Sequence, residues 1–159
     1  MLDLILVRHG QSQYNADQTG GEDAPLTDLG RRQAARVAAY LGSRFQINAL
    51  YASTYIRARE TAEIINVGLG LELQLDPDLR EAAYEYGLGL ELFADPRKAL
   101  ELHPALRPQD ISEYYVGFQA RVNRALGRII AAHPEGQVAI VSHGGTMGTI
   151  IRTVAGNHH

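Results

Sequence analysis

Short apolar segments alternate along the chain with longer segments of helical periodicity. The runs at 4–7 and 138–141 are apolar at every position, which is typical of strands buried on both faces of a parallel sheet. Weaker strand candidates lie at 47–52 and 71–75, and an Asp-Pro pair follows the second of them. This pattern predicts parallel strands that are connected by helices.

The helical segments have recognisable starts and ends. We expect helices over about 27–42, 55–67, 110–133 and 145–154. In the first, Thr27 or Asp28 is the expected cap, and Leu29, Val37 and Leu41 lie on one side. The third begins with the capping-box spacing of Asp110 and Glu113.

Strands that alternate with helices place the chain in the α/β class. We expect a three-layer α/β/α sandwich with a mostly parallel central sheet, formed by a single domain over 1–159. The segment at about 82–108 does not fit this alternation. We interpret it as a small cap insertion over the site, where it would select the substrate.

Composition and charge narrow the choice of partners. The hydrophobic fraction of 45% is enough for a buried core, and the net charge of -3 gives no global positive field for nucleic acid or an anionic membrane. The chain has no cysteine, which excludes disulfides, thiolate nucleophiles and Cys-ligated metals. The apolar run that ends before Arg8 is too short for a signal sequence or a membrane span, so we expect a cytoplasmic protein.

Basic side chains follow the predicted strands at the points where the strands end. Arg8 and His9 come directly after the first strand, His143 follows the last, and Arg57 opens the helix after the second. In an open α/β sheet, ligands bind beyond the carboxyl ends of the strands. We therefore expect these four side chains to face one crevice, with Ser53 and Ser142 capping helices or holding loops beside them.

This group of side chains suits a phosphoryl group, whose negative charge is spread over several oxygens. Two guanidiniums can hold such a group bidentately, while Gly10 and Gly144 allow the backbone to approach it. One neutral imidazole can attack phosphorus, and the other, protonated among the phosphate oxygens, can hydrogen-bond the transferring group. Glu81 follows the third strand and can serve as general acid and base. We expect no metal and no cofactor, because no carboxylate cluster is evident.

Several motifs then occur in a fixed order over residues 4–154. These are Leu-Val-Arg-His-Gly-Gln-Ser at 6–12, Asn15, Leu-Thr-Asp-Leu-Gly at 26–30, Ser-Thr-Tyr-Ile-Arg-Ala-Arg-Glu-Thr-Ala at 53–62, Leu-Arg-Glu at 79–81 and Val-Ser-His-Gly-Gly at 141–145. Together they resemble the motifs of the histidine phosphatase superfamily, the phosphoglycerate-mutase-like enzymes. The resemblance implies His9 as the phosphorylated nucleophile, Arg8, Arg57 and His143 as the phosphate pocket, Glu81 as proton donor, and Asn15 as an accessory phosphate contact.

Two departures from the family pattern bear on the activity. Phosphoglycerate mutases follow the acid with an Arg-His-Tyr-Gly run, whereas Ala82 and Ala83 follow Glu81 here, which disfavours mutase activity. The step from Glu81 to Gly87 is also longer than in the family, which leaves Glu85 as an alternative acid. We therefore expect a metal-independent phosphatase that hydrolyses small phosphate monoesters through a phosphohistidine on His9.

Other readings stay open from the sequence. Within enzymes these are a phosphoglycerate-type mutase and a protein phosphohistidine phosphatase, and outside enzymes a non-catalytic domain that binds a phosphorylated ligand. The expected partner is a small phosphorylated metabolite. Members of the family that this sequence resembles commonly continue beyond the last helix with an edge strand. The resemblance therefore leaves a truncated C-terminal edge open here, and a homodimer could complete the open sheet edge.

Overall fold

The computed structural model describes residues 1–21, 23–82 and 108–156, and within the last range it describes side chains from 117 onward. The cap insertion expected at 82–108 therefore lies outside the described residues except at its two ends. The same is true of Glu85, the alternative acid. Both stay predictions.

All four predicted strands are present and form one parallel sheet. They are β1 (Leu2–Arg8), β2 (Ile47–Ser53), β3 (Leu73–Asp76) and β4 (Gly136–Ser142), in the spatial order β1-β4-β2-β3. The central position of β4 agrees with its sequence, because Val138 to Val141 are completely buried. The continuous apolar run is therefore the mark of a strand covered on both faces.

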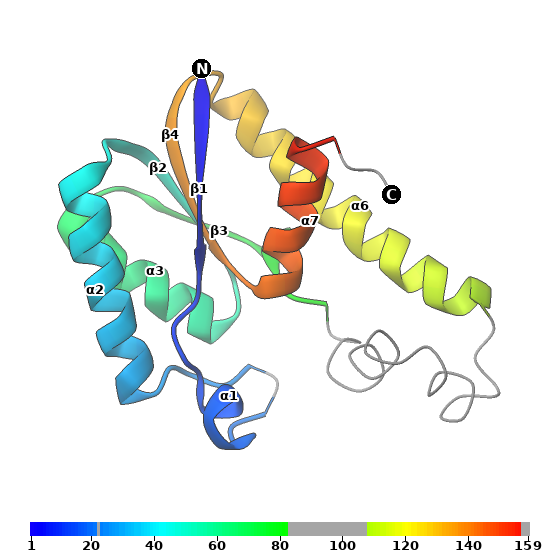
Figure 1. Ribbon diagram of the computed structural model, residues 1–159, viewed down its shortest axis with the longest axis horizontal. Coiled ribbons are helices and arrows are strands. Elements are labelled where there is room, and N and C mark those ends of the chain that lie inside the picture. The colour runs from blue at the N-terminus through cyan, green and yellow to red at the C-terminus, as the bar shows by residue number, and fades with distance from the viewer. Residues whose placement is uncertain (22, 83–107, 157–159) are drawn as a thin grey trace.

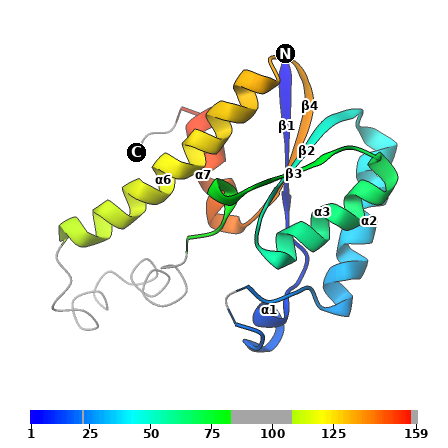
Figure 2. The same ribbon diagram turned by 180° about the vertical axis from the view of Figure 1, so that it is seen from behind.

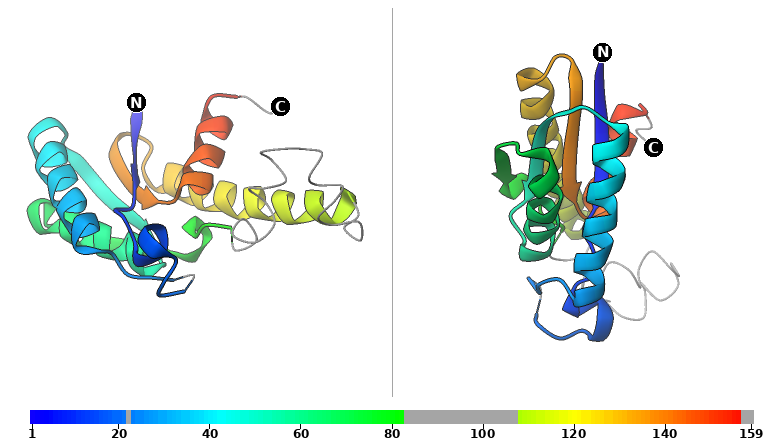
Figure 3. Two further views of the ribbon diagram at one scale, coloured as in Figure 1. Left: turned by 60° about the horizontal axis from the view of Figure 1, so that its bottom comes forward. Right: turned by 90° about the vertical axis from the view of Figure 1, so that its left-hand side faces the viewer.

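The long helices cover both faces of this sheet. They are α2 (Asp28–Arg44), α3 (Ile56–Leu69), α6 (Pro108–Ala132) and α7 (Gly144–Val154). Figures 1 and 3 show α2 and α3 on one side of the strands and α6 and α7 on the other. The expected three-layer α/β/α sandwich is confirmed.

Each helix pair buries its own half of the core. Leu50 and Val141 pack toward α2 and α3, whereas Tyr51 and Ile140 pack toward α6 and α7. Successive residues of a strand point to opposite faces, so each of these strands supplies both cores. Seen from behind in Figure 2, α2 and α3 again lie on one side of the strands, and α6 and α7 on the other.

Two short elements were not predicted. The helix α1 (Gln13–Asp17) follows β1, and its start is capped by a capping box between Ser12 and Asn15. A 3₁₀ helix, η1 (Pro77–Leu79), follows β3. Both are too short to show a periodic pattern, and both lie beyond the carboxyl ends of the strands, on the edge of the sheet where the candidate residues gather.

Some details of the predicted helices need correction. Helix α6 begins at Pro108, two residues before the expected cap, and proline at a first helical position is favourable because its φ is already helical. In α2 the cap is Thr27, whose side chain accepts the Gly30 N–H. Leu29, expected on the apolar side of α2, is 43% exposed.

The first half of α2 packs inward through small residues. Gly30 and Ala34 are buried, and a Cβ atom on Gly30 would collide with the backbone carbonyl of Gln11. A Cβ atom on Gly10 would in turn collide with the backbone of Gly30. These two glycines bring α2 directly against the loop that carries His9.

None of the helices in the residues described is both long and apolar enough to cross a bilayer.

The contact between Gly30 and Gln11 can be tested by adding one methyl group. Gly30→Ala should lower the free energy of unfolding by about 1–3 kcal/mol, because the neighbouring atoms are backbone and cannot move aside as a side chain would. Gly42→Ala is the matched control in the same helix. Its Cβ would meet nothing within 4 Å, so it should stabilise the protein by about 0.5–1 kcal/mol. Equilibrium unfolding in urea measures both, and a Gly30→Ala protein as stable as wild type would contradict the close packing.

Candidate active site

The two candidate histidines are brought together by the pairing of β1 with β4. In this register Arg8 lies opposite Ser142, and the backbone N–H of His9 donates to the Ser142 carbonyl at 3.0 Å. The His9 and His143 rings follow these strands side by side, with their centroids 5.1 Å apart. The strand pairing therefore brings the two rings next to each other at the carboxyl ends of the strands.

Hydrogen bonds define the protonation of His9. Its Nδ1 lies 2.7 Å from the Gly10 carbonyl oxygen, and Nε2 lies 3.2 Å from Nε of Arg57. A guanidinium can only donate, so Nε2 accepts and the ring proton is on Nδ1, where it is donated to Gly10. The ring is therefore neutral, and its lone pair is on Nε2, where it accepts from Arg57.

Burial and neighbouring cations keep His9 in this neutral form. The pKa of His9 is lowered to about 4, first by removal of the ring from water and then by the positive charges of Arg57 and Arg8. The hydrogen bond to Gly10 opposes this shift but is outweighed. A neutral imidazole with an accessible lone pair is the form that can act as a nucleophile.

His143 is completely buried and is also held neutral. Its pKa is lowered to about 2, mainly by burial and then by the charge of Arg57. Nε2 lies 2.8 Å from the Ser53 hydroxyl, whereas Nδ1 has no hydrogen-bond partner among the described residues. Protonation of this ring, expected from the sequence, would thus need a bound anion to stabilise the charge.

Arg57 is buried at the start of α3. Arginine is rarely buried in proteins unless its charge is paired. Its guanidinium carbon lies 4.9 Å from the centre of the Tyr55 ring. The Thr61 hydroxyl connects this part of α3 to the His9 loop, because it donates to the Arg57 carbonyl at 2.7 Å and accepts the Gly10 N–H at 3.1 Å. The sequence assigned no role to Thr61, although it is part of the recognised motif.

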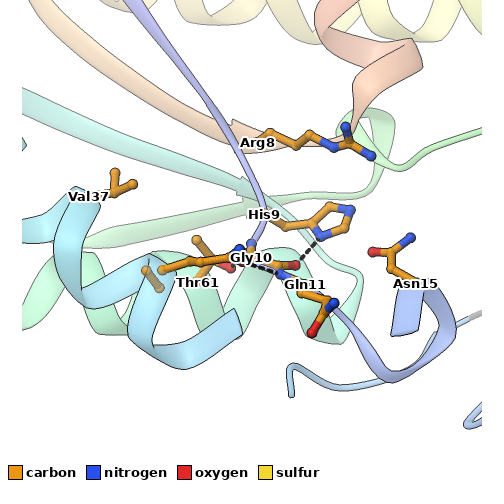
Figure 4. A pocket seen from close by; sticks show the side chains of 9 residues that line it. Arg8, His9, Gly10, Gln11, Asn15, Val37 and Thr61 are labelled. Atoms are coloured by element: carbon orange, nitrogen blue, oxygen red, sulfur yellow. Dashed lines mark hydrogen bonds between the residues drawn. The ribbon is translucent and has the colours of Figure 1, made fainter. Parts of the chain in front are cut away.

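A cavity of about 430 Å³ opens beside His9. Its lining residues are Arg8, His9, Gly10, Gln11, Asn15, Gln33, Ala34, Val37 and Thr61. Figure 4 shows the Arg8 side chain next to the His9 ring and Asn15 across from it. Arg57, Glu81 and His143 do not line this cavity, and all three are buried.

Asn15 and Gly144 take positions consistent with ligand contacts. The Asn15 carbonyl oxygen accepts from the Ser12 hydroxyl at 2.9 Å, so that its amide group is fixed at the cavity rim. Gly144 is the first residue of α7 and is exposed, and a Cβ there would meet no protein atom within 4 Å. Protein packing alone therefore does not require glycine at this position.

Glu81 is buried at the amino terminus of α7. Its carboxylate accepts hydrogen bonds from the backbone N–H groups of Gly145 at 2.9 Å and Thr146 at 3.2 Å. The helix dipole favours a negative charge at this place. Glu81 thus contacts the two residues that lie two and three positions after His143. It does not line the cavity beside His9.

The backbone around Glu81 is fixed by an arginine that the sequence did not indicate. Arg121, on α6, donates to the carbonyl oxygens of Asp78 at 2.8 Å, Arg80 at 2.6 Å and Glu81 at 3.1 Å. A single guanidinium thus holds three carbonyl groups of this loop. No local pattern could reveal this, because the contacts depend on the packing of α6 against η1.

The two buried serines play different parts. Ser142, at the end of β4, donates to the Leu79 carbonyl at 2.7 Å and so holds a loop, as expected. Ser53 also holds a loop, because its oxygen accepts the Tyr55 N–H at 3.2 Å, and in addition its hydroxyl lies 2.8 Å from the ring of His143.

The described residues contain no group of three or more histidine, aspartate or glutamate side chains that could hold a metal ion. The positive groups of this site that could receive an anion are the guanidiniums of Arg8, which lines the cavity, and Arg57, which contacts His9. The arrangement can therefore bind an oxyanion beside a neutral nucleophilic imidazole.

The lowered pKa values predict how both histidines titrate. An unfolded histidine takes up a proton near pH 6.5, but His9 and His143 should stay neutral in the folded protein to below pH 5. As pH falls from 6.5 toward 4, the unfolded chain binds protons that the folded chain does not. The free energy of unfolding should therefore fall by up to about 1.4 kcal/mol per pH unit for each ring. A ring NMR titration checks this, and proton uptake by either ring near pH 6.5 would contradict it.

Comparison with known proteins gives consistent matches over most of the chain. The sequence profile of the histidine phosphatase superfamily (branch 1) matches residues 4–159. The "Probable phosphoglycerate mutase GpmB" of Cronobacter sakazakii is 34% identical, with 98% of this chain and 76% of the relative covered. The "Uncharacterized phosphatase PhoE" of Bacillus subtilis is 29% identical, with 98% and 79% covered.

Solved structures agree with these sequence matches. A mycobacterial glucosyl-3-phosphoglycerate phosphatase in complex with VO3 is 28% identical and superimposes with a TM-score of 0.70, covering 95% of this chain and 79% of that one. The similarity therefore extends from the motifs to the whole arrangement of strands and helices. The chain belongs to the histidine phosphatase superfamily.

Proposed function

We propose that this protein is a phosphatase that hydrolyses small phosphate monoesters through a phosphohistidine on His9. The observation that carries the proposal is the state of the His9 ring, which is neutral, has its proton on Nδ1 and presents the Nε2 lone pair to Arg57. The name of the vanadate-bound mycobacterial relative, a phosphatase, supports the same type of reaction.

In the first step, the phosphoryl group of the substrate would enter beside Arg8 and Arg57. The Arg57 N–H groups would turn from the neutral ring to the anionic oxygens, because a charge-assisted hydrogen bond is the stronger one. This movement frees Nε2 of His9 to attack phosphorus. The N–P bond forms as the ester O–P bond breaks, and Glu81 gives a proton to the leaving alkoxide.

In the second step, water hydrolyses the phosphohistidine. The Glu81 carboxylate takes a proton from the water, the resulting hydroxide bonds to phosphorus, and the N–P bond breaks to return neutral His9. Phosphate leaves, with the proton remaining on Glu81 for the next turnover. His143 would donate from Nδ1 to the phosphoryl oxygens in both steps.

The nucleophile can be tested by trapping the intermediate. Rapid quench of the protein with p-nitrophenyl phosphate, without added metal, should yield an acid-labile phosphopeptide that contains His9. His9→Ala should give no label and lose at least about 1,000-fold in turnover, because the covalent step is removed. His133→Ala is a matched control, since His133 bonds to Tyr51 away from the site and should leave labelling intact.

The outcome also separates the other readings. Binding of inorganic phosphate without turnover or label would assign the pocket to a non-catalytic binding domain. Label that passes to a hydroxyl of phosphoglycerate rather than to water would make the protein a mutase, and label that is acquired only from a phosphohistidine protein would make it a protein phosphohistidine phosphatase.

The acid role of Glu81 predicts a dependence on the leaving group. Glu81→Gln should lower kcat/KM by about 100-fold or more for alkyl phosphates but by less than about tenfold for p-nitrophenyl phosphate, whose leaving group needs no proton. Glu60→Gln is the matched control, because Glu60 also accepts a backbone N–H, from Leu26, but lies outside the site. Equal losses on both substrates would exclude Glu81 as the acid and favour Glu85.

A further inference from the structure

The Ser53 hydroxyl is the direct neighbour of the second histidine. Ser53 is the last residue of β2 and is completely buried. Its oxygen lies 2.8 Å from Nε2 of His143 and 3.2 Å from the backbone N of Tyr55. These two contacts determine where the proton of the hydroxyl points.

Only one arrangement satisfies both neighbours and also gives the hydroxyl hydrogen an acceptor. The Tyr55 N–H can only donate, so the oxygen of Ser53 accepts from it. The hydroxyl hydrogen then needs an acceptor, and among the described residues the remaining partner of Ser53 is Nε2 of His143. If Nε2 carried the proton instead, the buried hydroxyl would have no acceptor, which costs free energy.

The second nitrogen of the ring points to the same assignment. Nδ1 of His143 is buried and has no partner among the described residues, and the ring lies against His9 and near the charge of Arg57. With Nε2 accepting from Ser53, a neutral ring must carry its proton on Nδ1. That N–H is then a fixed donor, ready for a phosphoryl oxygen.

We propose that Ser53 is a positioning residue that holds His143 as the Nδ1–H tautomer, so that this N–H is aimed at the transferring phosphoryl group. The part of this proposal that concerns catalysis rests on the proposed function, whereas the tautomer does not. Tautomer control matters because the other tautomer would present a lone pair to the anion, and two lone pairs repel.

The chain supplies a matched control for this role. Ser142 ends the neighbouring strand, is equally buried and also donates its hydroxyl proton, but to the Leu79 carbonyl rather than to a histidine. Ser142→Ala thus removes a buried hydroxyl from the same region without touching His143. Ser53→Thr keeps a hydroxyl at the position under test.

The tautomer is read directly from ring nitrogen shifts. In the full chain labelled with ¹⁵N-histidine, Nδ1 of His143 should show the shift of a protonated nitrogen and Nε2 that of an acceptor, with His143→Gln used for assignment. Ser53→Ala should move both signals toward a mixture of tautomers. Ser53→Thr and Ser142→Ala should keep the wild-type pattern.

Kinetics with p-nitrophenyl phosphate give the functional side. Ser53→Ala should lower kcat/KM by about 10- to 100-fold, because the Nδ1–H of His143 is then no longer held as a donor to the developing charge. Ser53→Thr keeps the hydroxyl and should restore kcat/KM to within about threefold. A wild-type His143 protonated on Nε2, or a Ser53→Ala protein with unchanged ring shifts, would overturn the proposal. The wild-type spectrum alone decides the first point even if Ser53→Ala does not fold.

Failure of the proposed function would look different. A protein that neither turns over nor labels, but shows the Nδ1–H tautomer and loses it in Ser53→Ala, refutes the phosphatase and retains the positioning role. A protein that forms phosphohistidine with His143 protonated on Nε2 refutes the positioning role alone.

Discussion

The parallel pairing of β1 with β4 is the constraint on which the site depends. Its register places Arg8 opposite Ser142, and the residues that follow, His9 and His143, then leave the sheet as neighbours. These residues are about 130 positions apart in the sequence, so no local interaction could bring them together. A shift of register by one residue would turn the side chains to the opposite faces of the sheet. The register of this strand pair thus sets the geometry of the two histidines.

The site combines burial with positive charge, and the two effects act in the same direction on the histidines. Burial lowers the pKa of His9, and Arg57 beside it lowers the pKa further. A carboxylate next to either ring would raise its pKa. Instead, the Gly10 carbonyl contacts the His9 ring and the Ser53 hydroxyl contacts the His143 ring, so that neither contact adds a negative charge. The result is a pair of neutral rings among cations. Protonation of either ring would place a further positive charge in a buried, already cationic site.

The sequence was informative where the signal is local or repeated. All four strands and the four long helices follow from hydrophobic patterns, and the histidines follow from their places after buried strands. The sequence did not predict features that depend on contacts between elements far apart in the chain. Leu29 was expected inside because it is large and apolar, but the close approach of α2 selects the small Gly30. Arg121 carries no local signal at all, because its partners are backbone carbonyls that any sequence would offer.

Glu81 shows how long-range contacts set a functional position. Glu81, the proposed acid, follows β3 in the chain, yet its carboxylate is held by the start of α7 and its backbone by Arg121 of α6. Residues 83–107 connect the Glu81 loop to α6 along the chain, and Arg121 ties the two ends of this connection together in space. Because both ends are fixed to the same framework, substitutions between them need not displace the acid.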